Sequence, residues 1–437
     1  MSNCTDELLE FPALKRKKIQ AQFSGGDITS DGGVLLLREV DRQLGLLKSV
    51  DQVLHDPRHP ERIVHSQLSL LRQRVYGLCQ GYEDLNDHHQ LRLDPAFQTA
   101  LDRDEALGSE ATLCRLENRV DRQAMVDIHN IFLDQFIASF DTPPDELILD
   151  FDATDDPTHG QQAHTFYHGY YRHYCFLPLY VFCNDQLLVS YLRPSNQDGA
   201  RHSGAILKLL VTALRAQWPD VRIIFRADGG FCRHRTLGWC ERNDVDYIVG
   251  YTRNHRLSKI IAASLKQVQE AFEERHEKQR EFMDFYYAAK TWNKKRRVIA
   301  KLEVTAKGSN PRFILTSLQG DNQALYDDLY CARGDMENRI KEQQLGLFAD
   351  RTSSTQWWAN QFRLMLSSLA YILLETIRRT ALKGTELERA QVTTIRLKLL
   401  KIGAVVLRNT RRIRFLLSSH YPYQDLFKSV VLKLHPQ

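Results

Sequence analysis

Residues 147–160 read LILDFDATDDPTHG, and this stretch decides the fold expected for the chain. It opens as an apolar run typical of a buried strand, which we place at residues 146–151. It then brings four aspartates into seven positions: Asp150, Asp152, Asp155 and Asp156. In α/β sheets, ligands bind at the carboxyl ends of the strands. The stretch therefore predicts a strand that delivers at least one acidic side chain to a functional edge.

The patterns around this strand predict a mixed sheet with flanking helices. Residues 28–140 are mostly helical in pattern, and Asp141-Thr-Pro-Pro marks a boundary. Further strands are expected at residues 174–183, 186–192, 221–227 and 246–250, and helices at 200–217 and 233–243. A charged helix over 260–282 precedes three β-like runs at 283–289, 297–306 and 312–318, which we interpret as an insertion. Helices resume at about 333–347, 356–380 and 393–408.

Composition excludes several classes of protein. No run approaches the roughly 18 apolar residues that a membrane span requires, and the first residues lack a basic-then-apolar signal pattern. The eight cysteines form no C-x-x-C pair, so neither a zinc ribbon nor a disulfide framework is indicated. These features predict a cytoplasmic protein with no membrane partner.

Basic residues are concentrated near both ends of the chain. The net charge is only +5, yet residues 389–437 hold ten Lys and Arg against the single acid Asp425, and KRKK occupies residues 15–18. Such local excess on a nearly balanced chain favours a surface that binds nucleic acid. Taken singly, either run is more typical of a solvated helix face.

Two aspartates lie where a sheet can bring them together. Asp152 ends the first strand, and Asp228, in FRADGGF, ends the strand at 221–227 in the same way. A lone aspartate at a strand end is commonly a helix or turn cap. Two neighbouring carboxylates repel unless a cation or proton lies between them. Oxygen-only sites of this kind suit Mg²⁺ or Mn²⁺, which activate water or a hydroxyl for attack on phosphate.

A third acid is available on the helix that contains YCARGDMENRIKEQQ. Tyr330, Arg333, Glu337 and Lys341 are spaced by three, four and four residues and share one helical stripe. Glu337 is therefore the candidate third ligand, although the same spacing describes an ordinary salt-bridged surface. Asp335 and Glu342 are weaker candidates because they lie off that stripe.

Together these residues resemble the DDE transposases of bacterial insertion sequences. The resemblance rests on DFDAT with Asp152, RADGGF with Asp228 and Y-x-x-R-x-x-x-E with Tyr330, Arg333 and Glu337, and the ITSDGG and GYEDLNDH stretches extend it over most of the chain. It implies a ribonuclease H-like core with a β-rich insertion before the glutamate. It also implies that Asp152, Asp228 and Glu337 form a triad holding two divalent ions, Mg²⁺ or Mn²⁺.

The resemblance further implies the activity and the partners. Such enzymes cut DNA at element ends and join the 3′-hydroxyl to target DNA, so terminal inverted repeats, target DNA and a homodimer on the DNA are expected. Tyr330 and Arg333 would contact the DNA backbone. The family places a lysine where this chain has Gln344, so Lys341 is the nearest substitute. Trp292, beside KKRR at 294–297, is a candidate for stacking on a flipped base, with core packing as the alternative.

Five segments follow from this interpretation. They are a helical DNA-binding or dimerisation region at 1–142, a first core part at 143–259, a β-rich insertion at 260–324, a core completion with the glutamate helix at 325–385 and a basic helical region at 386–437. Of the other aspartates, we expect Asp150 to cap the sheet edge or to support the site, and Asp155 and Asp156 to form a turn before Pro157. A Mg²⁺-dependent nuclease and a catalytically inactive DNA-binding protein are the alternative functions.

Overall fold

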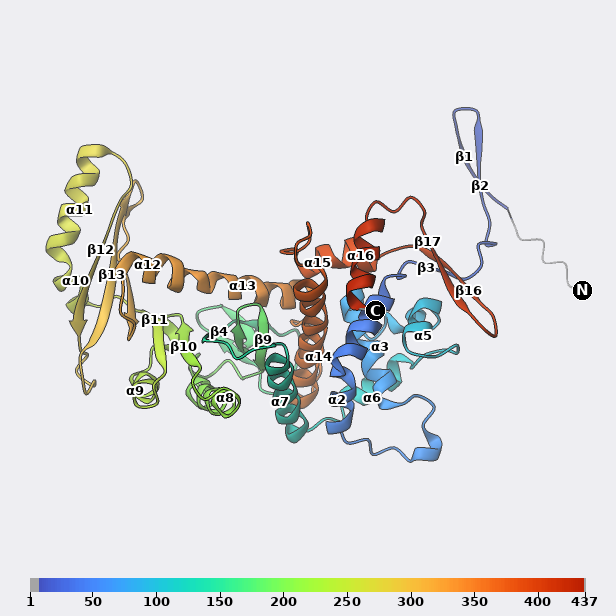
Figure 1. Ribbon diagram of the computed structural model, residues 1–437, viewed down its shortest axis with the longest axis horizontal. Coiled ribbons are helices and arrows are strands. Elements are labelled where there is room, and N and C mark those ends of the chain that lie inside the picture. Colours follow the sequence, from blue (N-terminus) through green and yellow to red (C-terminus); the bar gives the residue numbers. More distant parts are fainter. Residues whose placement is uncertain (1–7, 436–437) are drawn as a thin grey trace, which may run out of the picture. The chain divides into compact units, whose positions relative to one another are not determined.

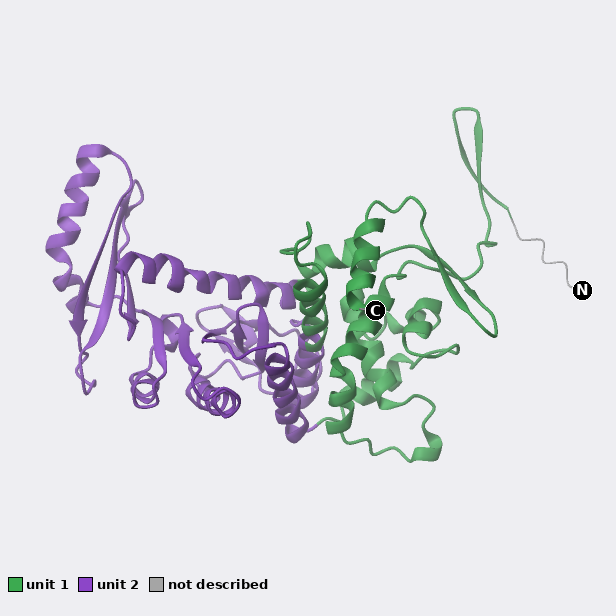
Figure 2. Cartoon of the chain, viewed as in Figure 1, with its two compact units in different colours: residues 1–120, 346–348, 369–437 green, residues 121–345, 349–368 purple. Residues whose placement is uncertain are grey.

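The computed structural model describes residues 8–435 and divides into two compact units, shown in Figure 2. Unit 1 contains the N-terminal residues up to Val120, residues 346–348 and the residues from Leu369 on. Unit 2 contains Asp121–Leu345 and Ala349–Ser368. The long helix α14 (Trp357–Thr376) therefore contributes its first part to unit 2 and the rest to unit 1. The finer division into five segments stays a prediction.

Unit 2 is built on one large mixed sheet, which confirms the expected α/β class. Nine strands follow the order β12-β13-β15-β11-β10-β4-β8-β9, with β14 beside β13. Strands β4, β10 and β11 run parallel, and the other pairs are antiparallel. The bounds are β4 Glu146–Ala153, β8 Leu179–Cys183, β9 Gln186–Tyr191, β10 Arg222–Ala227, β11 Asp246–Tyr251, β12 Gln279–Tyr287, β13 Arg296–Thr305, β14 Gly308–Ser309 and β15 Arg312–Thr316.

All five strands predicted for the first core part occur, but one of them is broken. The predicted strand at 174–183 divides into β7 (His173–Phe176) and β8, because Pro178 between them has no N–H to donate to a ladder. Strand β7 instead joins a small separate sheet with β5 (Asp156–Pro157) and β6 (Phe166–His168). Asp156 is consequently a buried strand residue that accepts a hydrogen bond from the Thr352 hydroxyl, and the turn predicted for it is wrong.

The three β-like runs of the predicted insertion do not form a sheet of their own. Strand β15 pairs with β11, and β13 pairs with β15, so the runs extend the main sheet at one edge (Figure 1). The helix expected over 260–282 consists of α10 (His255–Ile260) and α11 (Ala262–Arg275). It ends earlier than predicted because His276 adopts a left-handed conformation, and the following residues enter β12.

Helices complete unit 2. Besides α10, α11 and the first part of α14, they are α7 (Arg122–Ala138), α8 (Ser203–Gln217), α9 (His234–Arg242) and a helical run that begins at residue 322 and ends at Gly346, where unit 1 takes over. That run joins α12 (Asn322–Ala324), the π-helix η3 (Leu325–Tyr330), the 3₁₀ turn η4 (Cys331–Arg333), α13 (Gly334–Lys341) and the π-helix η5 (Glu342–Gly346). The edge strand β9 is covered by α14, whose Gln361 amide donates to the Ser190 carbonyl and accepts from the Leu192 amide just past the strand.

Unit 1 joins the N-terminal helices to the C-terminal segment. Its helices are α1 (Val34–Leu44), α2 (Leu46–Val53), α3 (Gln67–Gln80), α4 (His88–Leu91), α5 (Pro95–Ala100), α6 (Glu110–Glu117), α15 (Val392–Ile395) and α16 (Gln424–Leu434), with a 3₁₀ turn η1 (Pro60–Arg62) and π-helices η6 (Ile377–Ala381) and η7 (Arg396–Leu400). The strand β3 (Ile28–Thr29) pairs with β16 (Ala404–Arg408), which pairs with β17 (Ile413–Leu417). The buried carboxylate of Asp31 accepts a hydrogen bond from Lys401 and so links the same two segments.

The predicted helix over 393–408 is wrong beyond Leu400. The chain turns at Gly403 and continues as β16, whose Val405 and Val406 favour a strand. The basic C-terminal region is therefore partly a hairpin. The KRKK cluster also lies on a hairpin, formed by β1 (Leu9–Leu14) and β2 (Lys17–Ala21), with every residue exposed.

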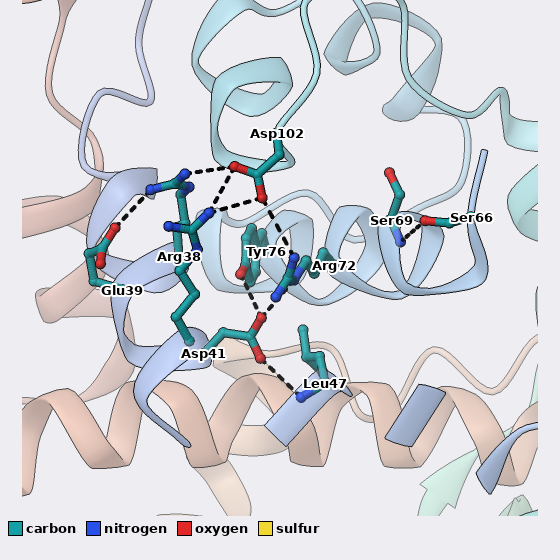
Figure 3. Close-up of polar contacts among 10 residues, drawn as sticks. Arg38, Glu39, Asp41, Leu47, Ser66, Ser69, Arg72, Tyr76 and Asp102 are labelled. Atoms are coloured by element: carbon teal, nitrogen blue, oxygen red, sulfur yellow. Dashed lines mark hydrogen bonds and ion pairs between the residues drawn. The ribbon is translucent and has the colours of Figure 1, made fainter. Parts of the chain in front are cut away.

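A buried carboxylate organises the helices of unit 1, as Figure 3 shows. Asp41 of α1 accepts hydrogen bonds from the Leu47 backbone, the Arg72 guanidinium and the Tyr76 hydroxyl at 2.9, 2.8 and 3.0 Å. These contacts join α1, the start of α2 and α3. Asp102, which is half exposed, then pairs with Arg38 at 2.6 Å. A buried charge is tolerated here because every partner is a donor.

Candidate active site

Asp152 and Asp228 lie side by side at the carboxyl ends of two central strands. The register of the parallel pair β4–β10 matches Phe151 with Ala227, so Asp152 and Asp228 are each the next residue along the chain, Asp228 directly after β10. Asp228 also caps the short helix η2 (Gly229–Phe231), and its Oδ1 accepts from the Gly230 amide at 2.8 Å. The side chain of Asp152 accepts from the Ala153 amide at 2.9 Å. The sheet thus brings both predicted acids to one edge.

Arg333 connects the strand end to the helical run. Its guanidinium lies 3.7 Å from a carboxylate oxygen of Asp152 and 2.7 Å from one of Glu337. Glu337 follows Arg333 by one helical turn, so these two residues of the predicted stripe lie together near Asp152. The structure therefore brings Asp152, Arg333 and Glu337 into one cluster, with Asp228 on the neighbouring strand.

The electrostatics of this cluster show a deficit of positive charge. Burial raises the pKa of Asp152 to about 7, the Arg333 guanidinium acts in the opposite direction, and Asp228 and Glu337 add to the rise. Burial also raises the pKa of the Tyr330 hydroxyl, which has Arg333 and Asp228 as its charged neighbours. One arginine does not balance three carboxylates at such a site.

The donor set fits a divalent cation, although the carboxylates are not gathered around a single point. Within residues 8–435, no group of three or more His, Cys, Asp or Glu side chains is arranged so that it could hold a metal ion. Glu337 instead pairs with the Arg333 guanidinium at 2.7 Å. Carboxylate oxygens of Asp152 and Asp228 on adjacent strands, with uncompensated negative charge, are nevertheless the ligand type that Mg²⁺ and Mn²⁺ prefer.

A buried ion pair beneath the cluster was missed by the sequence analysis. Asp150 lies in the centre of the sheet, not at its edge, and accepts two hydrogen bonds from Arg226 at 2.5 and 2.7 Å. The expectation that Asp150 caps the sheet edge is therefore wrong. Arg226 also donates to the Leu329 carbonyl at 2.6 Å, within the π-helix η3, which ends at Tyr330. The pair holds the helical run against the strands that carry Asp152 and Asp228.

This arrangement predicts separable effects on stability and activity. Arg226→Met leaves the Asp150 carboxylate buried without its partner and should reduce the free energy of unfolding by about 3–5 kcal/mol. The double variant Arg226→Met/Asp150→Leu removes both charges and should recover most of that stability. Its DNA cleavage should stay reduced, because the Leu329 carbonyl has still lost its donor. Recovery of both stability and cleavage in the double variant would show that Arg226 does not position the helix.

Gly250 is a second residue that the sequence analysis did not identify. It lies on β11, and a Cβ added there would come within 2.6 Å of the Gly229 nitrogen, 2.7 Å of the Tyr330 hydroxyl and 3.1 Å of the Asp228 carbonyl carbon. The Asp228 backbone and Tyr330 therefore close over a position that only glycine fits. The strand pattern DYIVG gave no signal of this, because the atoms that fill the space come from distant segments.

The remaining predicted residues differ in their surroundings. Trp292 is half-buried and packs against Tyr251, Tyr287 and Arg296, with ring centroids 5.5 and 5.8 Å apart and the guanidinium 5.0 Å from the ring. Lys341 is exposed at the end of α13. Gln344, at the position where a lysine was expected, donates to the Asp155 carbonyl at 2.9 Å. It thereby ties the helical run to the loop that follows β4.

The comparison with protein families decides the class of the chain. A model described as "Transposase DDE domain group 1" matches residues 11–437. The chain belongs to the DDE transposase family. Family membership makes it a DNA-processing enzyme by class, and the DDE transposases generally use divalent metals. A search of curated proteins found no match.

Among solved structures, the chain is similar to a piggyBac transposase. That structure was determined by cryo-EM as a synaptic complex with hairpin DNA. The two proteins share 11% sequence identity over 85% of this chain and 80% of the other, with a TM-score of 0.42. Among the described residues, no helix has the length and apolar character needed to cross a membrane.

Proposed function

We propose that this protein catalyses cut-and-paste transposition, in which DNA strands are cleaved at the ends of an element and the 3′-hydroxyl is joined to target DNA. Family membership supports the class of reaction. The observation that carries the site assignment is the placement of Asp152 and Asp228 at adjacent ends of parallel strands, with Arg333 and Glu337 facing them. The order β9-β8-β4-β10-β11 supports a ribonuclease H-like core.

In this proposal, Asp152, Asp228 and Glu337 hold two divalent ions, Mg²⁺ or Mn²⁺. When bound, such ions activate the attacking oxygen and stabilise the leaving oxygen of an in-line displacement at phosphorus. The protein supplies the orientation. The sheet register places the two aspartates, and the bond from Arg226 to the Leu329 carbonyl places the helix that carries Glu337.

The cations and aromatic groups around the triad would position the DNA strand. Arg333 already pairs with Asp152 and Glu337, and a DNA phosphate offers the same guanidinium a bidentate partner. Tyr330, beside Asp228, would donate to a phosphate oxygen, and the exposed Lys341 would add a backbone contact. Trp292 packs against Tyr251 and Tyr287. To stack on an unpaired base it would have to give up some of these contacts, so core packing is the main alternative role for this residue.

The basic hairpin residues and the C-terminal segment would bind element ends, and two copies of the chain would pair two ends. DNA affinity should therefore fall steeply with salt. A Mg²⁺-dependent nuclease with the same site, and an inactive DNA-binding protein, are the competing functions.

One assay separates these functions. The protein is incubated with Mg²⁺, a target plasmid and a DNA that bears the repeats flanking its gene. We expect cleaved ends and joined products. Cleavage without joining would assign a nuclease, and bound but intact DNA would assign a non-catalytic role. A DNA with scrambled repeats is the matched control, and it should be neither cleaved nor joined.

A further inference from the structure

A groove with an excess of unpaired cations lies between the starts of α8 and α9 in unit 2. It has a volume of about 600 Å³. Its lining includes Arg201, His202, Lys208, Arg233, His234 and Arg235, with Asp198 as the only acidic residue among the residues that line it. Asp198 is already engaged by Arg233 at 2.5 Å. Within the described part of the chain, no carboxylate pairs with Arg201, Lys208 or Arg235, so the groove is strongly positive.

Both helices present their N-terminal ends to this groove. The first turns of α8 and α9 line it, and neither the cap residue His202 nor the cap residue Arg233 makes a side-chain capping bond. The two helix starts are adjacent, because a Cβ on Gly204 of α8 would lie 3.1 Å from the Thr236 hydroxyl of α9. Backbone N–H groups at a helix start attract phosphate. In α8 the Ser203 and Ala205 amides already donate to the Ala200 and His202 carbonyls, so the basic side chains carry most of the attraction here.

The loop that forms one wall of the groove is held in place by hydrogen bonds from a buried arginine. The buried Arg193 donates to the Leu177 carbonyl at 2.9 Å and to the carbonyls of Gly199 and Arg201 at 2.8 and 2.7 Å. Arg233, at the start of α9, donates hydrogen bonds to the Asp198 carboxylate and so joins this loop to the helix. Burial and the nearby Arg201 and Arg193 lower the pKa of His202, which agrees with positive surroundings. The groove is therefore pre-organised for an anion.

We propose that this groove binds the phosphate backbone of the target DNA, separately from the acidic cluster. Arg233 follows Asp228 by five residues, and five residues of fully extended chain span at most roughly 18 Å. The Arg233 side of the groove therefore lies within that distance of Asp228. The groove offers guanidinium, ammonium, imidazole and backbone N–H donors, which contact phosphates without reading sequence. Contacts of this kind hold a duplex irrespective of its sequence, and we assign that role to target DNA. The identity of the DNA rests on the proposed transposase function.

The binding claim is tested on the full chain without any catalytic step. Fluorescence anisotropy measures the affinity for a labelled duplex that lacks the flanking repeats, over a series of salt concentrations. The test variant Arg201→Glu/Arg235→Glu changes two exposed residues of the groove. The control Arg256→Glu/Lys259→Glu makes the same change in net charge on exposed positions of α10.

We expect the groove variant to lose more than tenfold in affinity. Each phosphate contact contributes about 0.9 to the slope of log affinity against log salt concentration, so losing two should reduce that slope by about 1.8. The control should change the affinity less than twofold. Equal losses in the two variants, or no loss in the groove variant, would overturn the proposal. Thermal unfolding of both variants should match the wild type, since all four residues are exposed.

The assignment to target DNA is tested by comparing the two steps of the reaction. In the groove variant, joining of a pre-cleaved end to a plasmid should fall at least tenfold, while cleavage at the element end stays within twofold of wild type. An equal fall in cleavage would assign the groove to the element end and contradict the target assignment. If the wild type neither cleaves nor joins, the proposed function has failed, whereas the anisotropy result still decides whether the groove binds DNA.

Discussion

Asp152→Asn is expected to lose at least about 10³-fold of the DNA cleavage rate, which corresponds to about 4 kcal/mol of transition-state stabilisation. The amide keeps the shape of the side chain but lacks the charge that a metal ligand provides. Asp228→Asn should behave in the same way. The measurement is single-turnover cleavage of a DNA that carries the flanking repeats, in Mg²⁺.

The same variant should not lose stability, and this separates a catalytic role from a structural one. Burial and the repulsion from Asp228 and Glu337 raise the pKa of Asp152 to about 7, so its charge is unfavourable in the metal-free protein. We expect Asp152→Asn to unfold at the same temperature as the wild type or higher. Asp155→Asn, three residues away and paired with His173, is the charge-matched control and should cleave normally. Cleavage by Asp152→Asn within tenfold of the wild-type rate would contradict the assignment.

Gly250→Ala is expected to reduce cleavage by about 10²-fold, although residue 250 carries no functional group. The new methyl would meet the Gly229 nitrogen and the Tyr330 hydroxyl at 2.6 and 2.7 Å, so the Asp228 backbone or Tyr330 must move. A displacement of about 1 Å near reacting groups can have an effect of this size. Overpacking should also lower the free energy of unfolding by about 1–3 kcal/mol.

Gly169→Ala is the matched control for this substitution. A Cβ at Gly169 meets no atom within 4 Å, so both cleavage and stability should be unchanged. Cleavage is measured below the unfolding temperature of Gly250→Ala, so that only folded protein is compared. Wild-type cleavage in that variant would mean that Asp228 and Tyr330 do not need their present positions.

The sequence correctly predicted which residues lie close together where an acidic residue directly follows an apolar strand pattern. Asp152 and Asp228 each end an apolar run, and parallel strands necessarily present such residues at one edge, so their proximity could be predicted. The stripe of Arg333 and Glu337 followed from helical spacing. All five strands of the first core part were also identified, because their apolar runs are long and bounded by turn residues.

The features that were missed depend on contacts between distant segments. Nothing local indicates that Arg226 reaches the Leu329 carbonyl, or that Tyr330 closes over Gly250. The ion pair of Asp150 with Arg226 requires the register of β4 on β10, which the pattern alone does not give. The strand at Ala404–Arg408 was taken for helix because its partner, β3, lies near the other end of the chain. In each case the deciding contact joins segments that are distant in the sequence.

The most direct test of the proposed metal-dependent active site is a change of ligand combined with a change of metal. Asp152→Cys and Asp228→Cys replace a carboxylate with a thiolate, which binds Mg²⁺ poorly and softer ions better. With Mg²⁺, both variants should cleave at least about 100-fold more slowly than the wild type. With Mn²⁺, they should recover to within about tenfold of the wild-type rate. Wild-type cleavage by either variant with Mg²⁺, or undiminished cleavage by the wild-type protein in a chelator, would contradict metal binding by Asp152 and Asp228.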